Sequence, residues 1–255
     1  MVLPAEEGRL ITSPVRILVA TAVPAERDAV ARAFPGPVRG TPVPGAAVQA
    51  VDGGPDLLAA GVGPALAAAS TAAALTAAAL AGRPYGLVVS AGIAGGFPPH
   101  APLGALVVAD EITAADLGAE TADGFLAVTG LGFGTVTHRP PESLVRAAAA
   151  AAGARAGTVL TVSTVTGTAA RAEALRARHP RALAEAMEGF GVAEAAAAQG
   201  VPVLEVRAVS NPVGPRDRAA WRIGEALTAL TEGFGKLGPV LESWNPHENP
   251  HEEPA

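Results

Sequence analysis

Two acidic residues, an arginine and an asparagine stand out because of what surrounds them in the sequence. Glu26 begins a helical pattern just after an apolar run, and Glu188 opens a stretch that is mostly alanine. Arg207 interrupts another apolar run, which ends at Asn211. A carboxylate can take a proton from water or accept hydrogen bonds from hydroxyls, whereas an amide and a guanidinium donate them. Brought together, these side chains could activate water against a polar substrate.

Each of the four also has an ordinary structural explanation. Glu26 would stabilise the start of its helix, where the helix dipole favours negative charge. Glu188 could be a solvated charge, because glutamate is a common helix former. Arg207 could pair with a structural carboxylate, and Asn211 could simply form a turn. Taken singly, none of them establishes a site.

The elements that would position these residues are apolar runs alternating with helical segments. Strands are predicted at 15–21, 46–51, 56–62, 87–92, 105–112, 157–164 and 201–210. Helices are predicted at 24–34, 65–81, 141–152, 169–178, 182–198 and 218–241. Continuous Val and Leu runs are typical of strands buried on both faces. The pattern predicts an α/β fold, a three-layer α/β/α sandwich around a central mixed, mostly parallel sheet.

Ligands of such folds bind at the carboxyl ends of the strands. The segments that follow the predicted strands there are 24–26, 92–97, 163–166 and 210–211. The segment SAGIAGGFPP (90–99) lacks the G-x-G-x-x-G order and contains no Lys or Arg, so it is neither a dinucleotide loop nor a P-loop. Its glycines still allow a neutral ligand to approach the backbone closely, and we expect no organic cofactor.

Composition and charge exclude several classes of protein. A net charge of −6 without a basic stripe, with one Tyr and two Trp, disfavours binding to nucleic acid. The absence of Cys removes disulfides, thiolate metal sites and thiol nucleophiles. The apolar segment 65–81 is mostly Ala, which indicates a helix packed on a sheet and no membrane contact. The acidic start has no export signal, so we expect a cytoplasmic protein.

One catalytic domain is expected over residues 15–242. Residues 1–14 would be a flexible leader and 243–255 a disordered tail. Pro250 lies between His247 and His251, which disfavours a helical metal-binding pair. We expect no metal.

Several segments together resemble the methylthioadenosine/S-adenosylhomocysteine nucleosidase branch of the purine nucleoside phosphorylase family. They are ILVATAVPAERDAV, SAGIAGGF, DEITAADLGAE, VSTVTGT, AMEGFGVA and VRAVSNPVGPRDRAAW, in this order. The similarity covers roughly residues 15–240, and the last segment is most like the branch of that family that cleaves futalosine. The resemblance implies the nucleoside phosphorylase-like fold.

The resemblance also implies roles for individual residues. Glu26 matches the carboxylate that activates water, Arg207 matches the arginine beside that water, and Met187 with Glu188 matches the pair under the ribose. The residues expected around the base are Gly95, Ser163, Thr164, Val165, Thr166 and Trp221, the last of which could equally be core. The residues expected around the 5′ group are Phe97, Leu117, Arg216 and Arg218, of which the arginines could be ordinary surface charges.

Asn211 departs from the adenine-cleaving relatives, which carry an aspartate at this position. An amide cannot protonate N7, but it can donate a hydrogen bond to O6 or N7 of a 6-oxopurine. The resemblance therefore implies hydrolysis of futalosine, releasing hypoxanthine and dehypoxanthine futalosine in menaquinone biosynthesis. The source of the proton for the leaving base stays open.

Other functions remain compatible with the sequence. They are cleavage of aminodeoxyfutalosine or methylthioadenosine, a purine nucleoside phosphorylase, and a nucleoside-binding protein without catalysis. A requirement for phosphate and the identity of the released base would separate them. The only partners expected are a nucleoside and water, together with further copies of the chain, since the resemblance implies a homo-oligomer, a dimer or larger.

Overall fold

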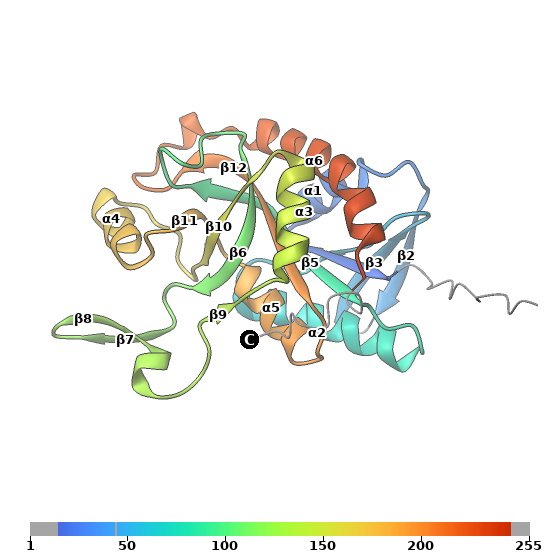
Figure 1. Cartoon of the computed structure of the whole chain (residues 1–255), viewed down its shortest axis with the longest axis horizontal. Helices are drawn as coiled ribbons and strands as arrows, with labels where there is room; N and C mark the ends of the chain where they lie inside the picture. The colour runs from blue at the N-terminus through green and yellow to red at the C-terminus, as the bar shows by residue number, and fades with distance from the viewer. Residues whose placement is uncertain (1–14, 44, 246–255) are drawn as a thin grey trace, which may run out of the picture.

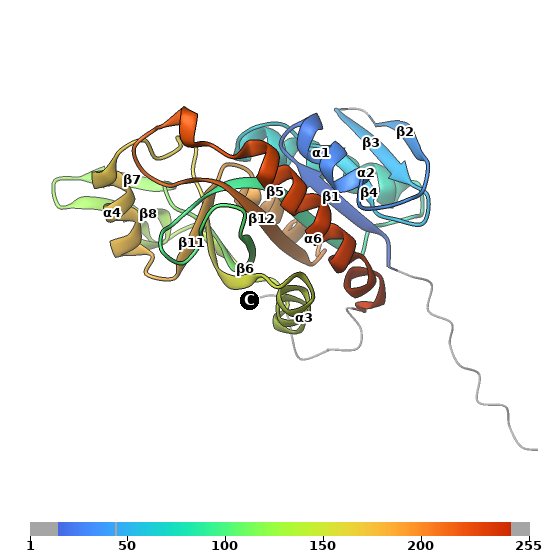
Figure 2. The same ribbon diagram turned by 90° about the horizontal axis from the view of Figure 1, so that it is seen from above.

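A 10-stranded mixed sheet separates two layers of helices (Figures 1 and 2). The computed structural model describes residues 15–43 and 45–245. The sheet contains β1 (Ile17–Thr21), β2 (Val38–Val43), β3 (Ala46–Val51), β4 (Asp56–Ala59), β5 (Leu87–Gly96), β6 (Leu106–Ala114), β9 (Thr137–His138), β10 (Arg155–Thr161), β11 (Ala182–Ala186) and β12 (Val203–Pro212). A separate hairpin is formed by β7 (Gly118–Thr121) and β8 (Gly124–Ala127) and projects from the body beside α4 (Figure 1).

The helices cover both faces of the sheet. They are α1 (Pro24–Ala31), α2 (Pro64–Leu80), α3 (Glu142–Ala152), α4 (Ala169–Arg178), α5 (Gly189–Ala197) and α6 (Ile223–Ser243), with short 3-10 turns η1 (Val128–Leu131) and η2 (Arg218–Ala220). Helices α1, α3 and α6 lie on one face, and α2 and α5 lie on the other (Figures 1 and 2). The predicted three-layer sandwich is confirmed.

The strand order is β11-β10-β6-β12-β5-β1-β4-β3-β2, with β9 beside β6. Parallel pairs join β5 to β1 and β12, β1 to β4, and β10 to β6 and β11. Hairpin connections make β2, β3 and β4 antiparallel, and β6 runs antiparallel to β12. The sheet is mixed, as predicted, and among the described residues it contains about as many antiparallel as parallel strand pairs.

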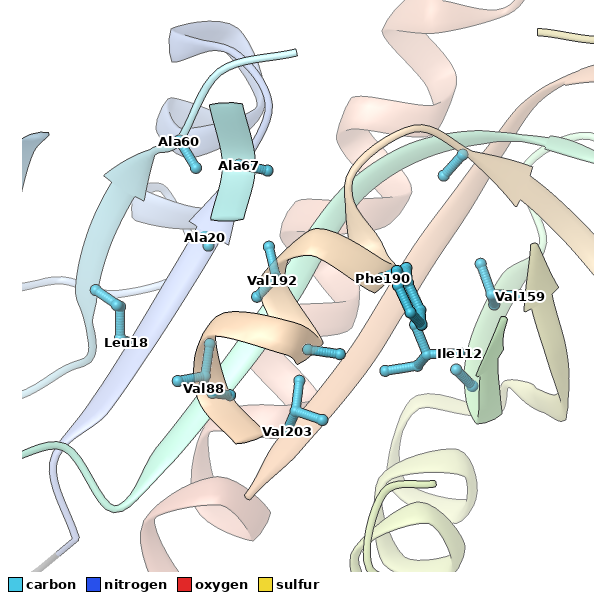
Figure 3. Packing of buried hydrophobic residues seen from close by; sticks show 14 of the residues in the cluster. Leu18, Ala20, Ala60, Ala67, Val88, Ile112, Val159, Phe190, Val192 and Val203 are labelled. Carbon is cyan, nitrogen blue, oxygen red and sulfur yellow. The ribbon is translucent and has the colours of Figure 1, made fainter. Parts of the chain in front are cut away.

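The central strand β5 is buried on both faces because its side chains alternate between two core clusters. Leu87 and Val89 pack in the cluster under α1, α3 and α6, whereas Val88 and Ala94 belong to the cluster under α2 and α5. Figure 3 shows the second cluster, which includes Val88 of β5 and Val192 of α5. An unbroken apolar run is what such a position requires.

Small residues let α2 and α5 approach closely. α2 buries Ala67, Ser70, Thr71 and Ala74, and a Cβ at Gly191 of α5 would lie 2.0 Å from the carbonyl oxygen of Pro64. The prediction of a helix packed on the sheet at 65–81 is confirmed, and none of the described helices has the length and apolar character needed to cross a membrane. This contact brings the beginnings of both helices together.

The prediction of one helix over 182–198 is wrong in its first part. Residues 182–186 form strand β11, which is buried and pairs with β10 and β5, and only 189–197 are helical. The segment ALAEA favours a helix by composition, but its long-range pairing overrides that preference. β2 was not predicted either, because Gly40 and Pro42 interrupt its pattern.

The last helix runs one residue past 242, where the predicted domain ends. Helix α6 continues to Ser243, and Trp244 packs against the cluster under that helix. The predicted leader at 1–14, and the part of the predicted tail from 246 on with its two histidines, lie outside the described residues.

Candidate active site

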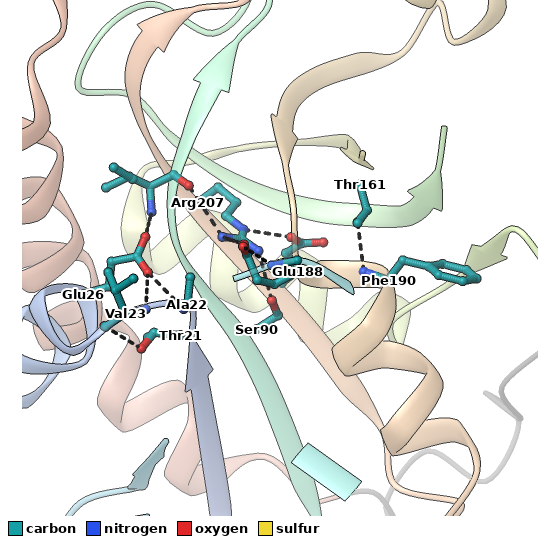
Figure 4. A network of polar contacts seen from close by, with 12 residues as sticks. Thr21, Ala22, Val23, Glu26, Ser90, Thr161, Glu188, Phe190 and Arg207 are labelled. Atoms are coloured by element: carbon teal, nitrogen blue, oxygen red, sulfur yellow. Dashed lines mark hydrogen bonds and ion pairs between the residues drawn. The ribbon is translucent and has the colours of Figure 1, made fainter. Parts of the chain in front are cut away.

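Glu26 links the start of α1 to the central strand of the sheet. It is the third residue of α1, after Pro24, and its Oε2 accepts hydrogen bonds from the N–H groups of Ala22 (3.0 Å) and Val23 (3.2 Å). Its Oε1 accepts from the N–H of Ile93 in β5 (2.9 Å; Figure 4). Glu26 therefore caps its helix, and the same carboxylate also reaches the middle of the sheet.

Burial governs the protonation of Glu26. The side chain is 4% exposed, and this burial raises the pKa of the carboxyl above its ordinary value. The positive charge of Arg207 and the hydrogen bond from Ile93 oppose that shift without cancelling it. A carboxyl with a raised pKa is a better proton acceptor near neutral pH than an exposed one.

Arg207 lies at the centre of a buried polar network. Its Nε donates to Glu205 Oε1 (2.8 Å), its Nη1 to Glu188 Oε2 (3.3 Å) and its Nη2 to Ser90 Oγ (3.2 Å; Figure 4). Burial lowers the pKa of Arg207, but the carboxylates around it raise the pKa by more, so the guanidinium stays charged. Arg207 therefore forms the ion pair that a structural role would require, and this pairing does not rule out a role in a site.

Glu188 joins the two helices that pack against each other on the opposite face. It precedes α5, is 6% exposed, and accepts a hydrogen bond from the N–H of Gly63 before α2 (3.3 Å) through Oε1. The interpretation of Glu188 as a solvated helix charge is therefore wrong. Met187, beside it, is partly buried.

Glu26 and Arg207 meet over Gly92, and the same Nη1 of Arg207 also donates to Glu188. A Cβ on Gly92 would lie 2.6 Å from Glu26 Oε1 and 2.8 Å from Arg207 Nη1. Only a residue without a side chain leaves these atoms in place. The place of a side chain at Gly92 is therefore taken by these two protein groups.

Asn211 lies in a cavity further along the same strands. Six of the residues predicted to contact the base or the 5′ group line it, namely Gly95, Val165, Thr166, Asn211, Arg216 and Trp221. A shift of register between Val209 and Asn211 bulges β12 here, and bulges beside sites commonly redirect a side chain. Ser210 Oγ donates to Asn211 Oδ1 (2.8 Å), and the amide Nδ2 donates to the carbonyl oxygen of Pro212 (3.1 Å), which leaves the second N–H of the amide as the donor available to a ligand.

The spacing between the carboxylates near Gly92 and the amide of Asn211 near Gly95 suits a nucleoside. Arg207 pairs with Gly92 and Asn211 pairs with Gly95, so the carboxylates and the amide are about three residues apart along β5. Three strand residues span about 10 Å. Water activation and recognition of the leaving group can therefore take place at opposite ends of one bound molecule.

Comparison with known proteins identifies the family of this fold and site. The model of the phosphorylase superfamily matches residues 17–237. The chain belongs to this superfamily. Futalosine hydrolase of Streptomyces coelicolor is 78% identical over 92% of this chain and 100% of its own length. Futalosine hydrolase of Acidothermus cellulolyticus is 49% identical over 88% of this chain and 91% of its own.

Solved structures of the superfamily share the fold. The 5′-methylthioadenosine/S-adenosylhomocysteine nucleosidase of Neisseria meningitidis has a TM-score of 0.73 at 19% identity, over 87% of this chain and 97% of its own. Futalosine hydrolase of Helicobacter pylori has a TM-score of 0.72 at 18% identity, over 88% and 97%. The resemblance stated from the sequence is confirmed, and so is the prediction of an N-glycosyl hydrolase.

Some predicted site residues of this superfamily member lie elsewhere. Ser163 and Leu117 line a separate hollow, where the Ser163 N–H donates to Asp116 Oδ2 (2.8 Å). Thr164 is exposed, and Phe97 is 2% exposed within a core cluster. Arg218 lies 5.7 Å from the centre of the Trp221 ring and Arg216 lies 5.3 Å from it. The four residues predicted for the 5′ group thus do not share one cavity.

Sequence analysis missed two buried acids of this site, Glu185 in the cavity and Glu205 beside Arg207. Both stand within apolar strands, where an isolated carboxylate is costly and needs partners. That signal was available for Glu205, but the helix predicted over 182–198 made Glu185 look like an ordinary surface charge. Within the described ranges, no three His, Asp or Glu side chains cluster so that they could hold a metal ion.

Proposed function

We propose that this chain hydrolyses the N-glycosidic bond of futalosine, releasing hypoxanthine and dehypoxanthine futalosine in menaquinone biosynthesis. The observation that carries the proposal is the arrangement along β5, where Glu26, Arg207 and Glu188 lie together and Asn211 pairs three residues further along, a strand length of about 10 Å. The high identity to two futalosine hydrolases supports the choice of substrate.

Glu26 is the base that removes a proton from the attacking water. An ionised carboxylate has about four lone-pair sites. Backbone N–H groups of Ala22, Val23 and Ile93 occupy three of them, which leaves one for water. The pKa of Glu26, raised mainly by burial, makes this carboxylate a stronger base than an exposed one.

Glu188 holds the sugar in this mechanism. Gly63 and Arg207 each occupy one of its oxygens, so the carboxylate is fixed in place, and its remaining lone pairs can accept the 2′ and 3′ hydroxyls. Its negative charge also stabilises positive charge that develops on the ribose as the bond to the base breaks. Met187 lies next to it under the sugar.

Asn211 stabilises the departing purine by donating to O6 or N7. We expect Asn211→Ala to lower kcat for futalosine about 10²- to 10³-fold, because one preorganised donor has an effect of that size in comparable sites. Steady-state assay of released hypoxanthine measures it. Gln199→Ala, which removes an exposed amide bonded to Thr76, serves as the control and should leave kcat unchanged. Wild-type turnover in folded Asn211→Ala protein would remove this role.

Water is favoured over phosphate as the nucleophile by the state of Arg207. Its guanidinium is already neutralised by Glu205 and Glu188, so it offers no net positive charge to a phosphate ion. A substrate with a 6-aminopurine base is disfavoured by Asn211. The amide N–H that faces a ligand is a hydrogen-bond donor, and so is the 6-amino group of such a base.

The decisive experiment supplies futalosine, inosine and methylthioadenosine with and without phosphate and follows the free base by chromatography. We expect hypoxanthine from futalosine without phosphate. Dependence on phosphate would identify a phosphorylase, and release of adenine would identify an adenine-cleaving nucleosidase. Tight binding with no turnover of any of them would identify a binding protein.

The 5′ substituent of futalosine ends in an aryl carboxylate, for which Arg216 and Arg218 are suited. Both are exposed and flank Trp221 at the mouth of the cavity. We also assign the protein to the cytoplasm as a homo-oligomer.

A further inference from the structure

Glu205 is a buried acid of β12 that has no role in the steps proposed for hydrolysis. Its side chain is 0% exposed, its Oε1 accepts a hydrogen bond from Arg207 Nε (2.8 Å), and its Oε2 has no partner within the described part of the chain. Burial raises the pKa of the carboxyl, so an acid at this place costs stability that an apolar side chain would not. A role at the site would explain its presence.

Charge balance does not explain Glu205. Arg207 already forms an ion pair with Glu188 (3.3 Å), and its Nη1 lies close to Glu26, because a Cβ on Gly92 would contact both groups. Two carboxylates therefore already surround the single positive charge. A third makes this buried network more negative and supplies no compensation that Arg207 lacks.

The register of β5 and β12 places Glu205 at one edge of the Arg207 guanidinium. The two residues are two positions apart in β12, so their side chains lie on the same face of the sheet. Glu205 pairs with Ser90 of β5, and both accept from Arg207, Glu205 from Nε (2.8 Å) and Ser90 Oγ from Nη2 (3.2 Å). Figure 4 shows the contact with Ser90. A cross-strand pair thus holds the edge formed by Nε and Nη2.

Holding this edge fixes the direction of the remaining nitrogen, because a guanidinium is planar and rigid. Nη1 donates to Glu188 Oε2 (3.3 Å) and to the carbonyl oxygen of Ile93 (3.5 Å). The bond to Glu205 is shorter than either of these and than the bond to Ser90. Glu205 is therefore the main anchor of the guanidinium plane.

Gly189 leaves room for this anchor. A Cβ on Gly189 would lie 2.2 Å from Glu205 Oε1 and 2.3 Å from Oε2, so a residue with a side chain would displace the carboxylate. Gly189 begins α5 and directly follows Glu188. Glu205 thus lies between Arg207 and the turn that carries Glu188.

We propose that Glu205 is a positioning residue for hydrolysis, which holds the plane of Arg207 so that Nη1 stays between Glu188 and Glu26. It acts through Arg207 and contacts neither water nor ribose. The reaction then requires a hydrogen-bond acceptor of the right length at position 205, and it does not require a negative charge there. The inference rests on the proposed function, because the groups that it positions are those assigned to water and ribose.

Two substitutions separate the acceptor from the charge. Glu205→Gln keeps the length of the side chain and an oxygen that accepts from Nε, but it removes the charge. Glu205→Asp keeps the charge and withdraws the oxygen by one methylene. We expect Glu205→Gln to retain kcat within about 10-fold of wild type and Glu205→Asp to lower it about 10²-fold, the effect of a displacement of about 1 Å. Steady-state release of the free base measures both.

The same two substitutions at Glu142 serve as the control. Glu142 is an exposed acid of α3 in an ion pair with Arg146, so neither Glu142→Gln nor Glu142→Asp should change kcat. Equal kcat in the two Glu205 variants, or a lower kcat in Glu205→Gln than in Glu205→Asp, would overturn the proposal, because the charge would then matter at least as much as the position.

The acid limb of the pH profile reports whether Arg207 has moved. Burial raises the pKa of Glu26, the charge of Arg207 lowers it, and that of Glu188 raises it. Glu26 acts in its ionised form, so displacement of Arg207 in Glu205→Asp should raise this pKa and move the acid limb of kcat/KM to higher pH. Glu205→Gln should show no such rise. A purely structural role would lower stability in urea without moving the limb, and an unmoved limb in Glu205→Asp would contradict the proposal.

Circular dichroism establishes whether each variant is folded. If Glu205→Asp does not fold, Glu205→Leu replaces it, because leucine is uncharged like glutamine but has no acceptor, and it should show the same loss of kcat. A Glu205→Gln protein that does not fold would show that the charge itself is needed, and the proposal would fall.

Wild-type protein is assayed first with futalosine, inosine and methylthioadenosine. If it cleaves futalosine but the Glu205 variants do not differ as expected, this inference fails and the proposed function stands. If it cleaves only another nucleoside and the variants differ as expected with that substrate, the choice of futalosine fails and the role of Glu205 stands.

Discussion

Glu26→Gln should lower kcat for futalosine about 10²- to 10⁴-fold, the range contributed by a positioned general base. Glutamine keeps the shape of the side chain, but its amide cannot take the proton of water. The loss should appear in kcat, because Glu26 contacts the water and the ribose is held by Glu188. Release of hypoxanthine measures the rate, and circular dichroism establishes that the variant is folded.

The acid side of the pH profile offers a second measurement on the same residue. Glu26 acts in its ionised form, and burial raises its pKa, so kcat/KM should begin to fall at a pH above that expected for an exposed glutamate. Asp28→Asn removes an exposed carboxylate of the same helix, paired with Arg27, and should change neither rate nor profile. A Glu26→Gln enzyme with wild-type kcat would show that another group activates water.

The strands of this fold were predictable wherever their composition and their pairing agree. β1 and β5 are rich in apolar residues and are buried on both faces, so their sequence alone predicts a strand in the middle of the sheet. β11 is different, because ALAEA gains its extended form only from pairing with β10 and β5, which lie far away in the sequence. Parallel neighbours cannot be found from local pattern alone.

The candidate site was predictable to the extent that its residues follow strands. Glu26 and Asn211 were found because they come at the ends of clear apolar runs, and the structure brings both to β5. Glu185 was missed together with its strand, since an acid in a helix needs no explanation and an acid in a buried strand does. One wrong element thus concealed a buried acid that lines the cavity.

Helix packing could not be predicted from the sequence, yet it fixes the ribose end of the site. Glu188 receives the Gly63 N–H because α2 and α5 touch where Gly191 meets Pro64. The alanine content of α2 indicated a helix but not which partner it approaches. The periodicity of a helix predicts which of its faces is buried, but it does not predict which element packs against that face.

Replacing Arg207 should have the largest effect on stability. Arg207→Met removes the partner of two buried carboxylates, since Glu205 is fully buried, its Oε1 accepts from Arg207 and its Oε2 has no hydrogen bond, while Glu188 keeps only Gly63. Breaking a buried ion pair on one side lowers the free energy of unfolding by about 3–5 kcal/mol. Urea denaturation measures the loss. Arg146→Met, in an exposed pair with Glu142, should lower it by less than about 1 kcal/mol.

A double variant separates the structural role of Arg207 from its role in the reaction. Replacing a whole buried pair by apolar residues is often neutral or stabilising, so Arg207→Met/Glu205→Leu should regain most of the lost stability. Turnover should stay low, because Glu188 and Glu26 would still lack the positive charge that holds one and lowers the pKa of the other. Recovery of both stability and turnover would show that the arginine serves only to compensate Glu205, and that the two catalytic carboxylates do not need it.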